Sequence, residues 1–298
     1  MYAWESIQCT LDFIEENLDA KQDIKQLAAK AALSPFYYQR LFTKLVKKPV
    51  MEYIKLRRLA KACEILKESD DTILNIAVSC GFGSQEVFTR SFKDAYGMTP
   101  TSYRQKPIML NQFDKPDLLL NETEIEENSP LVSEGMVLEM KHIVLEQPIH
   151  FTGISGIVPI SAQLPLGETC GVDIPGQLWT QFHQLKHQLP KLHHGREIGV
   201  SYLNSKTPDG CFTYFTGAEC EAANTQWESF TLPPRAYIIC SFEAETFDEL
   251  VTASLNKAVK FSTRWLSEHG YVMDCFAPEI YHTAQIPSME LWYPYQSQ

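Results

Sequence analysis

Two stretches of the chain, fifty residues apart, each contain side chains that suit contact with base pairs. Arg40 and Gln85 have the forked geometry that fits a guanine edge and an adenine edge, and Thr89 suits a thymine methyl group. The positions that match at this offset are Ser34 with Ser84, Tyr38 with Phe88, Arg40 with Arg90, Phe42 with Phe92, and Tyr53 with Tyr103. The chemistry indicated is hydrogen bonding and apolar contact with DNA bases.

Each repeat has the parts of a helix-turn-helix unit. A short helix is expected over residues 24–31 and again over 73–80, and a tight turn follows each one. A serine then occupies an N-cap position, and a second helix is expected over 35–46 and over 85–96. In a helix-turn-helix unit the second helix places its N-terminal side chains in the major groove. The pattern therefore predicts two reading helices in one chain.

A longer helix is expected between the two units, over residues 50–66. At ~1.5 Å per residue it would be roughly 25 Å long. A rigid spacer of that length can hold two reading helices about one DNA turn apart, ~34 Å, on one face of the duplex. One molecule could then read two successive major grooves without forming a symmetric dimer.

The side chains expected to face DNA lie mainly near the start of each reading helix. They are Phe36, Tyr37, Gln39, Arg40 and Lys44 in the first unit, and Gln85, Glu86, Thr89, Arg90 and Lys93 in the second. Basic residues are expected at phosphates rather than at bases, with a solvated helix face as the alternative. These are Lys44, Lys47, Arg57, Arg58, Lys93 and Arg104. The carboxylate of Glu86 can accept a hydrogen bond from cytosine but repels phosphate.

The net charge of −11 is divided unevenly along the 298 residues. Residues 21–106 carry 16 basic and 8 acidic side chains, whereas residues 111–298 carry 10 basic and 24 acidic ones. This asymmetry indicates a basic nucleic-acid module joined to an acidic module. No apolar run reaches the ~18 residues that cross a bilayer, and no leader is recognised at the start. A cytoplasmic protein without membrane contact is expected, and its eight scattered cysteines are expected to be free thiols.

The chain is expected to form two domains. Residues 1–106 are expected to be an all-α domain with two helix-turn-helix units, residues 107–136 a linker, and residues 137–298 an α+β domain. In the last region, short β-branched and aromatic runs are interrupted by helical stretches at roughly 176–189 and 246–269. The order strand, helix, strand, strand then occurs twice, which predicts a domain made of two similar halves.

The first domain resembles a known family through long runs without gaps. The runs are IKQLAAKAALSPFYYQRLF from Ile24, YIKLRRLAKACEIL from Tyr53, and IAVSCGFGSQEVFTRSFKDAYGMTPTSYR from Ile76. They are similar to the AraC/XylS DNA-binding domain, in the branch that includes Rob. This resemblance implies a sequence-specific transcription regulator that binds double-stranded DNA. It favours an activator over a repressor and implies RNA polymerase as a further partner.

The tail of the chain resembles GyrI-like effector-binding domains. The resemblance is carried by Trp265-Leu266, Gly270-Tyr271, Glu279-Ile280-Tyr281 and Glu290-Leu291-Trp292-Tyr293-Pro294. It implies an aromatic-lined pocket with buried carboxylates, which fall on Glu279 and Glu290. Tyr281 and Trp292 would share a strand face with them, and Trp179, Tyr214 and Phe276 are further wall candidates.

A glutamate beside an aromatic residue on a strand either faces water or faces a pocket. If the two carboxylates are buried, a small lipophilic cation is the ligand they favour, through charge and cation–π contact. The rival hypothesis is a small-molecule hydrolase or a drug-sequestering protein with a DNA-binding appendage. No nucleophile–base spacing or phosphate loop supports an enzyme, so neither a catalytic residue nor a cofactor is expected. His183 and His187, with His193 and His194 following, are expected to be surface histidines rather than metal ligands.

Overall fold

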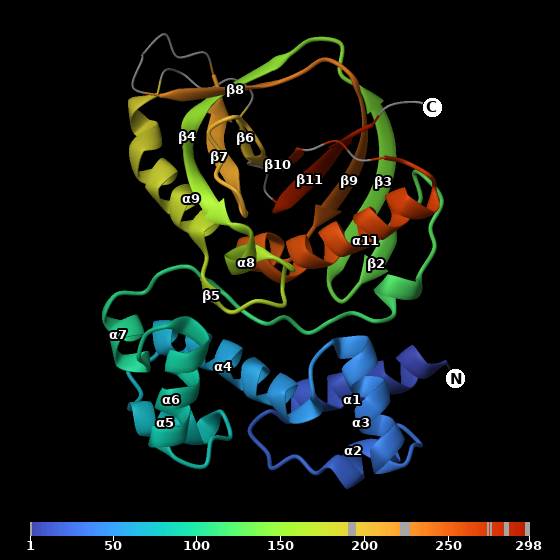
Figure 1. Ribbon diagram of the computed structural model, residues 1–298, viewed down its shortest axis with the longest axis vertical. Helices are drawn as coiled ribbons and strands as arrows, with labels where there is room; N and C mark the ends of the chain where they lie inside the picture. Colours follow the sequence, from blue (N-terminus) through green and yellow to red (C-terminus); the bar gives the residue numbers. More distant parts are fainter. Residues whose placement is uncertain are drawn as a thin grey trace. The chain divides into compact units, whose positions relative to one another are not determined.

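The computed structural model describes residues 2–189, 195–220, 227–272, 274, 276–282 and 286–295. The chain divides into two compact units (Figure 1). The first unit comprises Met1–Glu122 and Gly167–Val172, and the second comprises Thr123–Leu166 and Asp173–Gln298. Within the described part of the chain, no helix is both long and apolar enough to cross a bilayer.

The first unit is helical, as the sequence predicts. Its helices are α1 (Ala3–Glu16), α2 (Ile24–Lys30), α3 (Pro35–Val46), α4 (Val50–Glu68), α5 (Ile73–Ser79), α6 (Gln85–Tyr96) and α7 (Pro100–Gln105). Both reading helices begin at the predicted serines: Ser34 Oγ accepts a hydrogen bond from Tyr37 N at 3.4 Å, and Ser84 Oγ accepts one from Val87 N at 3.3 Å. The helix-turn-helix units are therefore confirmed.

Helix α4 contributes to two hydrophobic cores. Its first half, through Leu56, packs with α1, α2 and α3 around Tyr38 and Phe42. Its second half, from Leu59 onward, packs with α5, α6 and α7 around Phe92. Each core thus supports one reading helix, and both cores share one uninterrupted helix of 19 residues.

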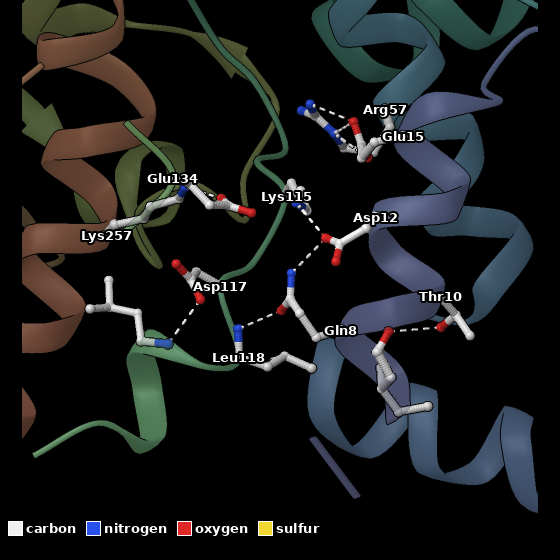
Figure 2. Close-up of polar contacts among 12 residues, drawn as sticks. Gln8, Thr10, Asp12, Glu15, Arg57, Lys115, Asp117, Leu118, Glu134 and Lys257 are labelled. Carbon is white, nitrogen blue, oxygen red and sulfur yellow. Dashed lines mark hydrogen bonds and ion pairs between the residues drawn. The ribbon is translucent and has the colours of Figure 1, made fainter. Parts of the chain in front are cut away.

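The segment that follows α7 belongs largely to the first unit and is not a free linker. Phe113 and Leu118 are 1% and 5% exposed and lie in the core built on α1. The Gln8 side chain accepts a hydrogen bond from Leu118 N at 2.8 Å and donates one to Asp12 at 3.0 Å (Figure 2). The first unit therefore extends to Glu122, inside the linker expected over residues 107–136. The reason is that two apolar side chains anchor the first half of that segment on the helices.

Two short strands complete the first unit. Strand β1 (Leu110–Asn111) pairs in antiparallel fashion with β5 (Gly171–Val172), although about sixty residues separate them in sequence. A single 3-10 turn, η1 (Leu120–Glu122), ends the continuous part of the unit.

The second unit combines a sheet with helices. Its first elements are β2 (Leu131–Ser133), β3 (Met136–Val144), β4 (Ile149–Pro159), α8 (Ile160–Gln163), α9 (Ile174–Leu185), η2 (Lys186–Gln188), β6 (Arg196–Tyr202) and β7 (Cys211–Glu219). They are followed by β8 (Glu228–Leu232), β9 (Ala236–Glu243), α10 (Phe247–Glu249), η3 (Leu250–Ser254), α11 (Leu255–Glu268), β10 (Ala277–His282) and β11 (Ser288–Pro294). Among the described residues the strand order is β2-β3-β9-β11-β10-β6-β7-β4-β8, and all the pairs are antiparallel (Figure 1).

The register of the central strands defines two faces of this sheet. Glu279 on β10 lies opposite Gly199 on β6 and opposite Leu291 on β11, whereas Ile280 lies opposite Ile198 and Glu290. Opposed residues share a face, and neighbouring residues point to opposite faces. The face that contains Glu279 carries α9 and α11, and we call it the helix face. The face that contains Ile280 holds the apolar cluster of the unit, and we call it the apolar face.

Candidate nucleic-acid interface and carboxylate site

The start of α3 presents exposed aromatic and basic side chains. Phe36 and Tyr37 are 63% and 62% exposed, which is unusual for large aromatic residues. The Arg40 guanidinium lies 5.6 Å from the centre of the Phe36 ring, so its charge is held against an aromatic face. Gln39 is exposed too, but its amide donates a hydrogen bond to the Pro35 carbonyl at 3.2 Å. These side chains are available to a ligand outside the helix.

Helix α6 presents the corresponding polar face. Gln85, Glu86 and Arg90 are exposed, Thr89 is partly exposed, and Phe88 lies in the core. Hydrogen bonds from Ser84 and from its own backbone N–H lower the pKa of Glu86, so this carboxylate is charged at the helix N-terminus. Its charge lies where a phosphate would otherwise approach.

The basic residues divide into surface and internal groups. Lys44, Lys47 and Lys93 are exposed and can reach a phosphate. Arg57 instead makes a forked contact with Glu15 at 2.9–3.1 Å (Figure 2). Its guanidinium also donates a hydrogen bond to the Phe113 carbonyl at 2.7 Å. Arg57 was expected at a phosphate, and the structure gives it an internal role.

Arg58 is internal for a similar reason. Its guanidinium donates to the carbonyl oxygens of Leu18, Ala20 and Gly81 at 2.7–2.8 Å. The Gly81 backbone has φ of +76°, and a Cβ there would lie 2.8 Å from the guanidinium. Arg58 therefore ties the turn of the second helix-turn-helix, at Gly81, to the segment that follows α1, all within the first unit. This internal role replaces the phosphate contact that the sequence predicts for Arg58.

On the helix face of the second unit, aromatic side chains surround the Glu279 carboxylate. Its Oε2 accepts hydrogen bonds from the Tyr214 hydroxyl at 2.8 Å and from the Tyr281 hydroxyl at 2.9 Å. Trp179 on α9 donates from its indole N–H to the Tyr214 oxygen at 3.0 Å. The rings of Trp179 and Tyr281 are 4.7 Å apart, centre to centre, in an edge-on arrangement. We call these four residues the Glu279 cluster.

The surroundings of the cluster penalise a negative charge. Burial raises the pKa of Glu279, and the two tyrosine hydrogen bonds offset only part of this effect. Burial likewise raises the pKa of Tyr214 and Tyr281 well above the ordinary value, so both remain hydroxyl donors. Glu279 nevertheless stays partly accessible. The arrangement suits a cationic group, which would compensate the carboxylate charge.

Glu290 lies on the opposite face in a different setting. It accepts hydrogen bonds from the Trp292 indole at 2.9 Å and from Lys141 at 3.3 Å, and His282 lies 3.4 Å away. Burial alone would raise the pKa of Glu290, but His282, Trp292 and Lys141 outweigh burial and lower it to about 2. The Glu290 carboxylate is therefore already paired with a cation of the fold, the Lys141 ammonium group. The structure therefore brings Tyr214, Trp179 and Tyr281 to Glu279, and it separates Glu290 and Trp292 from them.

Two features of the Glu279 region were not anticipated from the sequence. Gly199 gives the cluster its room, because a Cβ at this position would lie 2.2 Å from the Tyr214 hydroxyl oxygen. Glu197 is 7% exposed and binds His183 at 2.9 Å and Lys186 at 2.7 Å, which fastens the end of α9 to β6. Phe276, which the sequence offers as a wall residue of the pocket, packs on the apolar face and not in the Glu279 cluster. A glycine inside a strand was the available signal for the first feature.

His183 is thus bound to a carboxylate of the fold. Within the described ranges, no group of three or more His, Cys, Asp or Glu residues could hold a metal ion. His193 and His194 lie outside the described residues.

An open groove of about 750 Å³ runs along α1 in the first unit. It is lined by Glu5, Gln8, Cys9, Asp12, Phe13, Glu16, Lys30 and Leu119. Its three carboxylates against one lysine make it unsuited to DNA phosphates. It contains neither a reading-helix residue nor the Glu279 cluster.

Comparisons with known proteins agree with the helical unit. Residues 27–106 match the family described as a helix-turn-helix domain. The transposon Tn10 TetD protein of Escherichia coli is 40% identical over 102 residues, which cover 34% of this chain and 74% of TetD. The right origin-binding protein of Escherichia coli K12 is 34% identical over 132 residues, which cover 44% of this chain and 46% of that protein.

A solved structure shows a similar partial match. The crystal structure of the DNA-binding domain of AdpA, a global transcriptional factor, in complex with a target DNA has 26% identity and a TM-score of 0.33. It covers 33% of this chain and 89% of that chain.

The chain therefore belongs to the AraC/XylS family of helix-turn-helix transcription regulators. It spans less than half of the length of the right origin-binding protein.

Proposed function

We propose that this DNA-binding regulator responds to a small lipophilic cation, which binds in its second unit at Glu279. The observation that carries the proposal is the Glu279 cluster: a carboxylate with a raised pKa that accepts hydrogen bonds from two tyrosine hydroxyls, one of which accepts a hydrogen bond from the Trp179 indole. Glu290 is not part of the proposed site, since Lys141 already compensates its charge and His282 lies 3.4 Å away.

The chemistry of the cluster favours a cation over an anion or a neutral ligand. A buried carboxylate without a positive partner is costly, and a bound cation removes that cost. The electron-rich faces of Trp179 and Tyr281 attract a cation further, and they supply apolar area for its organic part. A compact, strongly hydrated ion lacks such apolar area, so a lipophilic cation fits best.

The helical unit supplies the DNA contacts in this proposal. The base-reading side chains would be Phe36, Tyr37, Gln39 and Arg40 on α3, with Gln85, Glu86, Thr89 and Arg90 on α6, and Lys44 and Lys93 would contact phosphates. The second unit is proposed to be GyrI-like, with β4-α9-β6-β7 and β9-α11-β10-β11 as its two related halves. Activation of transcription through RNA polymerase is proposed from the family resemblance alone.

The test is calorimetric titration of the full chain with tetraphenylphosphonium, a lipophilic monovalent cation. Glu279→Gln keeps the shape of the side chain and removes its charge, and we expect it to weaken binding by at least tenfold. Glu290→Gln is the matched control, since it removes a carboxylate from the neighbouring strand on the opposite face. Its affinity should stay within about threefold of wild type. Equal losses in both variants would contradict the assignment of the cation to Glu279.

A neutral compound of similar shape provides the second control. Triphenylphosphine oxide has three phenyl rings on phosphorus, an oxygen in place of the fourth ring, and no net charge. We expect it to bind at least tenfold more weakly than tetraphenylphosphonium to the wild-type chain. Equal binding of the two compounds would leave an aromatic site but would reject the cationic ligand.

A further inference from the structure

One short segment of the second unit's sequence belongs structurally to the DNA-binding unit. Residues Gly167–Val172 interrupt the second unit between α8 and α9, and they pack with the helices of the first unit. We call this segment the strap. No motif in the sequence accounts for the position of the strap.

The strap is fixed to the first unit by backbone and side-chain contacts. Its β5 strand pairs with β1 through Leu110 opposite Val172 and Asn111 opposite Gly171. At its other end, the Gly167 carbonyl accepts a hydrogen bond from Asp114 N at 2.8 Å. The strap is therefore held at both ends.

The middle of the strap reaches the cores that support the reading helices. The Cys170 side chain packs against the core around Phe42 and also against the core around Phe92. Strand β5 itself packs against α6, the second reading helix. The strap thus contacts the element that carries Gln85 and Arg90.

The strap continues directly into the helix that covers the Glu279 cluster. Val172 is followed by Asp173, whose side chain caps α9 by accepting a hydrogen bond from Gly176 N at 3.0 Å. Less than two turns later, Trp179 donates to Tyr214, which itself donates to Glu279. In α9 only Phe182 is fully buried, so polar contacts hold much of this helix in place.

We propose that the strap mechanically couples α9 to the second reading helix, so that displacement of α9 loosens or shifts α6. The ligand that displaces α9 is the cation of the proposed function, and to that extent the inference rests on it. The coupling itself is a property of the strap and can be tested without a ligand.

The physical reason lies in the short tether. Three peptide units join Cys170 to Asp173, and an extended chain spans at most roughly 3.3–3.6 Å per residue. A cation that enters between Trp179 and Glu279 must move the indole, and α9 carries the indole. Where that movement carries the start of α9 away from the strap, three peptide units offer little slack, so the pairing with β1 or the packing of Cys170 must yield. A packed core responds to such a change as a unit.

The first experiment slackens the tether without altering the contacts at either end. In the slack variant, Gly-Gly-Ser is inserted between Val172 and Asp173. In the control variant, the same tripeptide is inserted between Glu146 and Gln147, which are both exposed. DNA affinity is measured on a duplex selected from a random pool by the full chain, with and without tetraphenylphosphonium. We expect the cation to change the DNA dissociation constant at least fivefold in wild type and in the control, and less than 1.5-fold in the slack variant.

The reciprocal measurement checks that this change is a true coupling. DNA must alter the dissociation constant of tetraphenylphosphonium by the same factor as the cation alters that of DNA. The slack variant should bind each ligand alone within about twofold of wild type. A slack variant that retains the full coupling would overturn the proposal, as would a wild type that binds both ligands independently.

The second experiment needs no ligand and uses native cysteines as reporters. Trp179→Ala removes the indole contact that fastens α9, and we expect it to raise the alkylation rate of the Cys170 thiol by at least fivefold. Cys63 and Cys240, both 0% exposed, report whether each unit stays folded. Phe247→Ala is the control, since Phe247 is 52% exposed on another helix of the second unit.

The two experiments separate failure of the coupling from failure of the proposed ligand. If Trp179→Ala exposes Cys170 and tetraphenylphosphonium does not bind, the strap couples the units and the cation assignment is wrong. If Trp179→Ala leaves the Cys170 rate unchanged while Cys63 and Cys240 stay protected, the coupling is wrong even where the cation binds. Should Trp179→Ala unfold the second unit, His183→Ala, which loosens α9 at Glu197, takes its place with the same expected result.

Discussion

Gly199 on β6 lies directly opposite Glu279 on β10, and the missing side chain of the glycine is the space that the Tyr214 hydroxyl occupies. A Cβ at Gly199 would lie 2.2 Å from the Tyr214 hydroxyl oxygen and 2.8 Å from Glu279 Oε2. Both distances are far below van der Waals contact. The Glu279–Tyr214 hydrogen bond therefore depends on a residue that makes no polar side-chain contact itself.

Gly199→Ala should disrupt the Glu279 cluster while leaving the fold in place. The added methyl group must push the Tyr214 ring aside, at a cost of about 1–3 kcal/mol in the free energy of unfolding. The affinity for tetraphenylphosphonium should fall by about tenfold. Chemical denaturation and calorimetry on the full chain measure the two effects.

A double variant provides the control for that prediction. Tyr214→Phe removes the atom that the new methyl group meets most closely, so Gly199→Ala should cost less stability in the Tyr214→Phe background than in wild type. Coupling between neighbouring residues of this kind is typically about 0.5–3 kcal/mol. Additive effects of the two substitutions would contradict the steric explanation.

Charge removal at the two carboxylates should change stability in opposite directions. The pKa of Glu290 is lowered to about 2, so its charged form stabilises the fold. That contribution is complete above the unfolded pKa of about 4.3 and is lost as the pH falls toward 2. Glu290→Gln should therefore lower the free energy of unfolding at pH 7 by about 1–3 kcal/mol, and the difference should shrink below pH 4.

The pKa of Glu279 is raised, so the sign reverses. The folded state binds the proton more tightly, and its advantage is lost as the pH rises above the unfolded pKa of about 4.3. In the absence of ligand, Glu279→Gln should be more stable than wild type at pH 7 and no more stable near pH 4. Thermal melts between pH 3 and pH 8 report both variants. A loss of stability in Glu279→Gln at pH 7 would show that the carboxylate is compensated by a group within the fold.

Arg57→Ala should weaken the first unit rather than DNA contacts alone. The guanidinium bonds to Glu15 and to the Phe113 carbonyl would be lost, while Glu15 would keep its hydrogen bond from the Tyr53 hydroxyl. Because charged hydrogen bonds contribute about 1.5–3 kcal/mol, we expect a loss of roughly 2–3 kcal/mol in the free energy of unfolding. Lys44→Ala is the matched control with an exposed basic residue, and its stability should stay within about 0.5 kcal/mol of wild type.

Arg40→Ala and Lys44→Ala should differ in how they affect DNA recognition. Loss of a base contact costs about 1–3 kcal/mol on a selected site and relaxes the preference at one base pair, so this result is expected for Arg40→Ala. Lys44→Ala should weaken all sequences equally. It should also reduce by about one the slope of the logarithm of the association constant against the logarithm of salt concentration. Competition with random duplex DNA at several salt concentrations distinguishes the two effects, and identical behaviour would reject the division into base and phosphate contacts.

The helix-turn-helix elements of the first unit were predictable because the signals are local. Ser34 and Ser84 mark helix starts by their positions, and the apolar spacing within each helix predicts which side faces the core. The roles of Arg57 and Arg58 were not predictable in this way. The partner of Arg57, Glu15, is 42 positions away, and such a pair leaves no periodic signal.

In the second unit, the sequence predicted that strands alternate with two helical stretches, but it did not predict how the strands pair. Whether Glu279 and Glu290 share a face depends on the register of β10 and β11, in which Ile280 lies opposite Glu290. A shift of one residue would have brought both carboxylates to one face. The strap was beyond sequence reasoning for the same reason, since β1 and β5 are two-residue strands that only distant contacts define.

The sharing of α4 between two cores limits the kind of operator that the protein can use. Leu56 belongs to one core and Leu59 to the other, so the helix cannot bend between them without opening both. The distance and angle between α3 and α6 are then constants of the molecule. One extra base pair between the two half-sites would displace the second by ~3.4 Å and rotate it by roughly 35° around the duplex. Binding sites of this regulator should therefore tolerate base substitutions at single positions far better than any change in spacing.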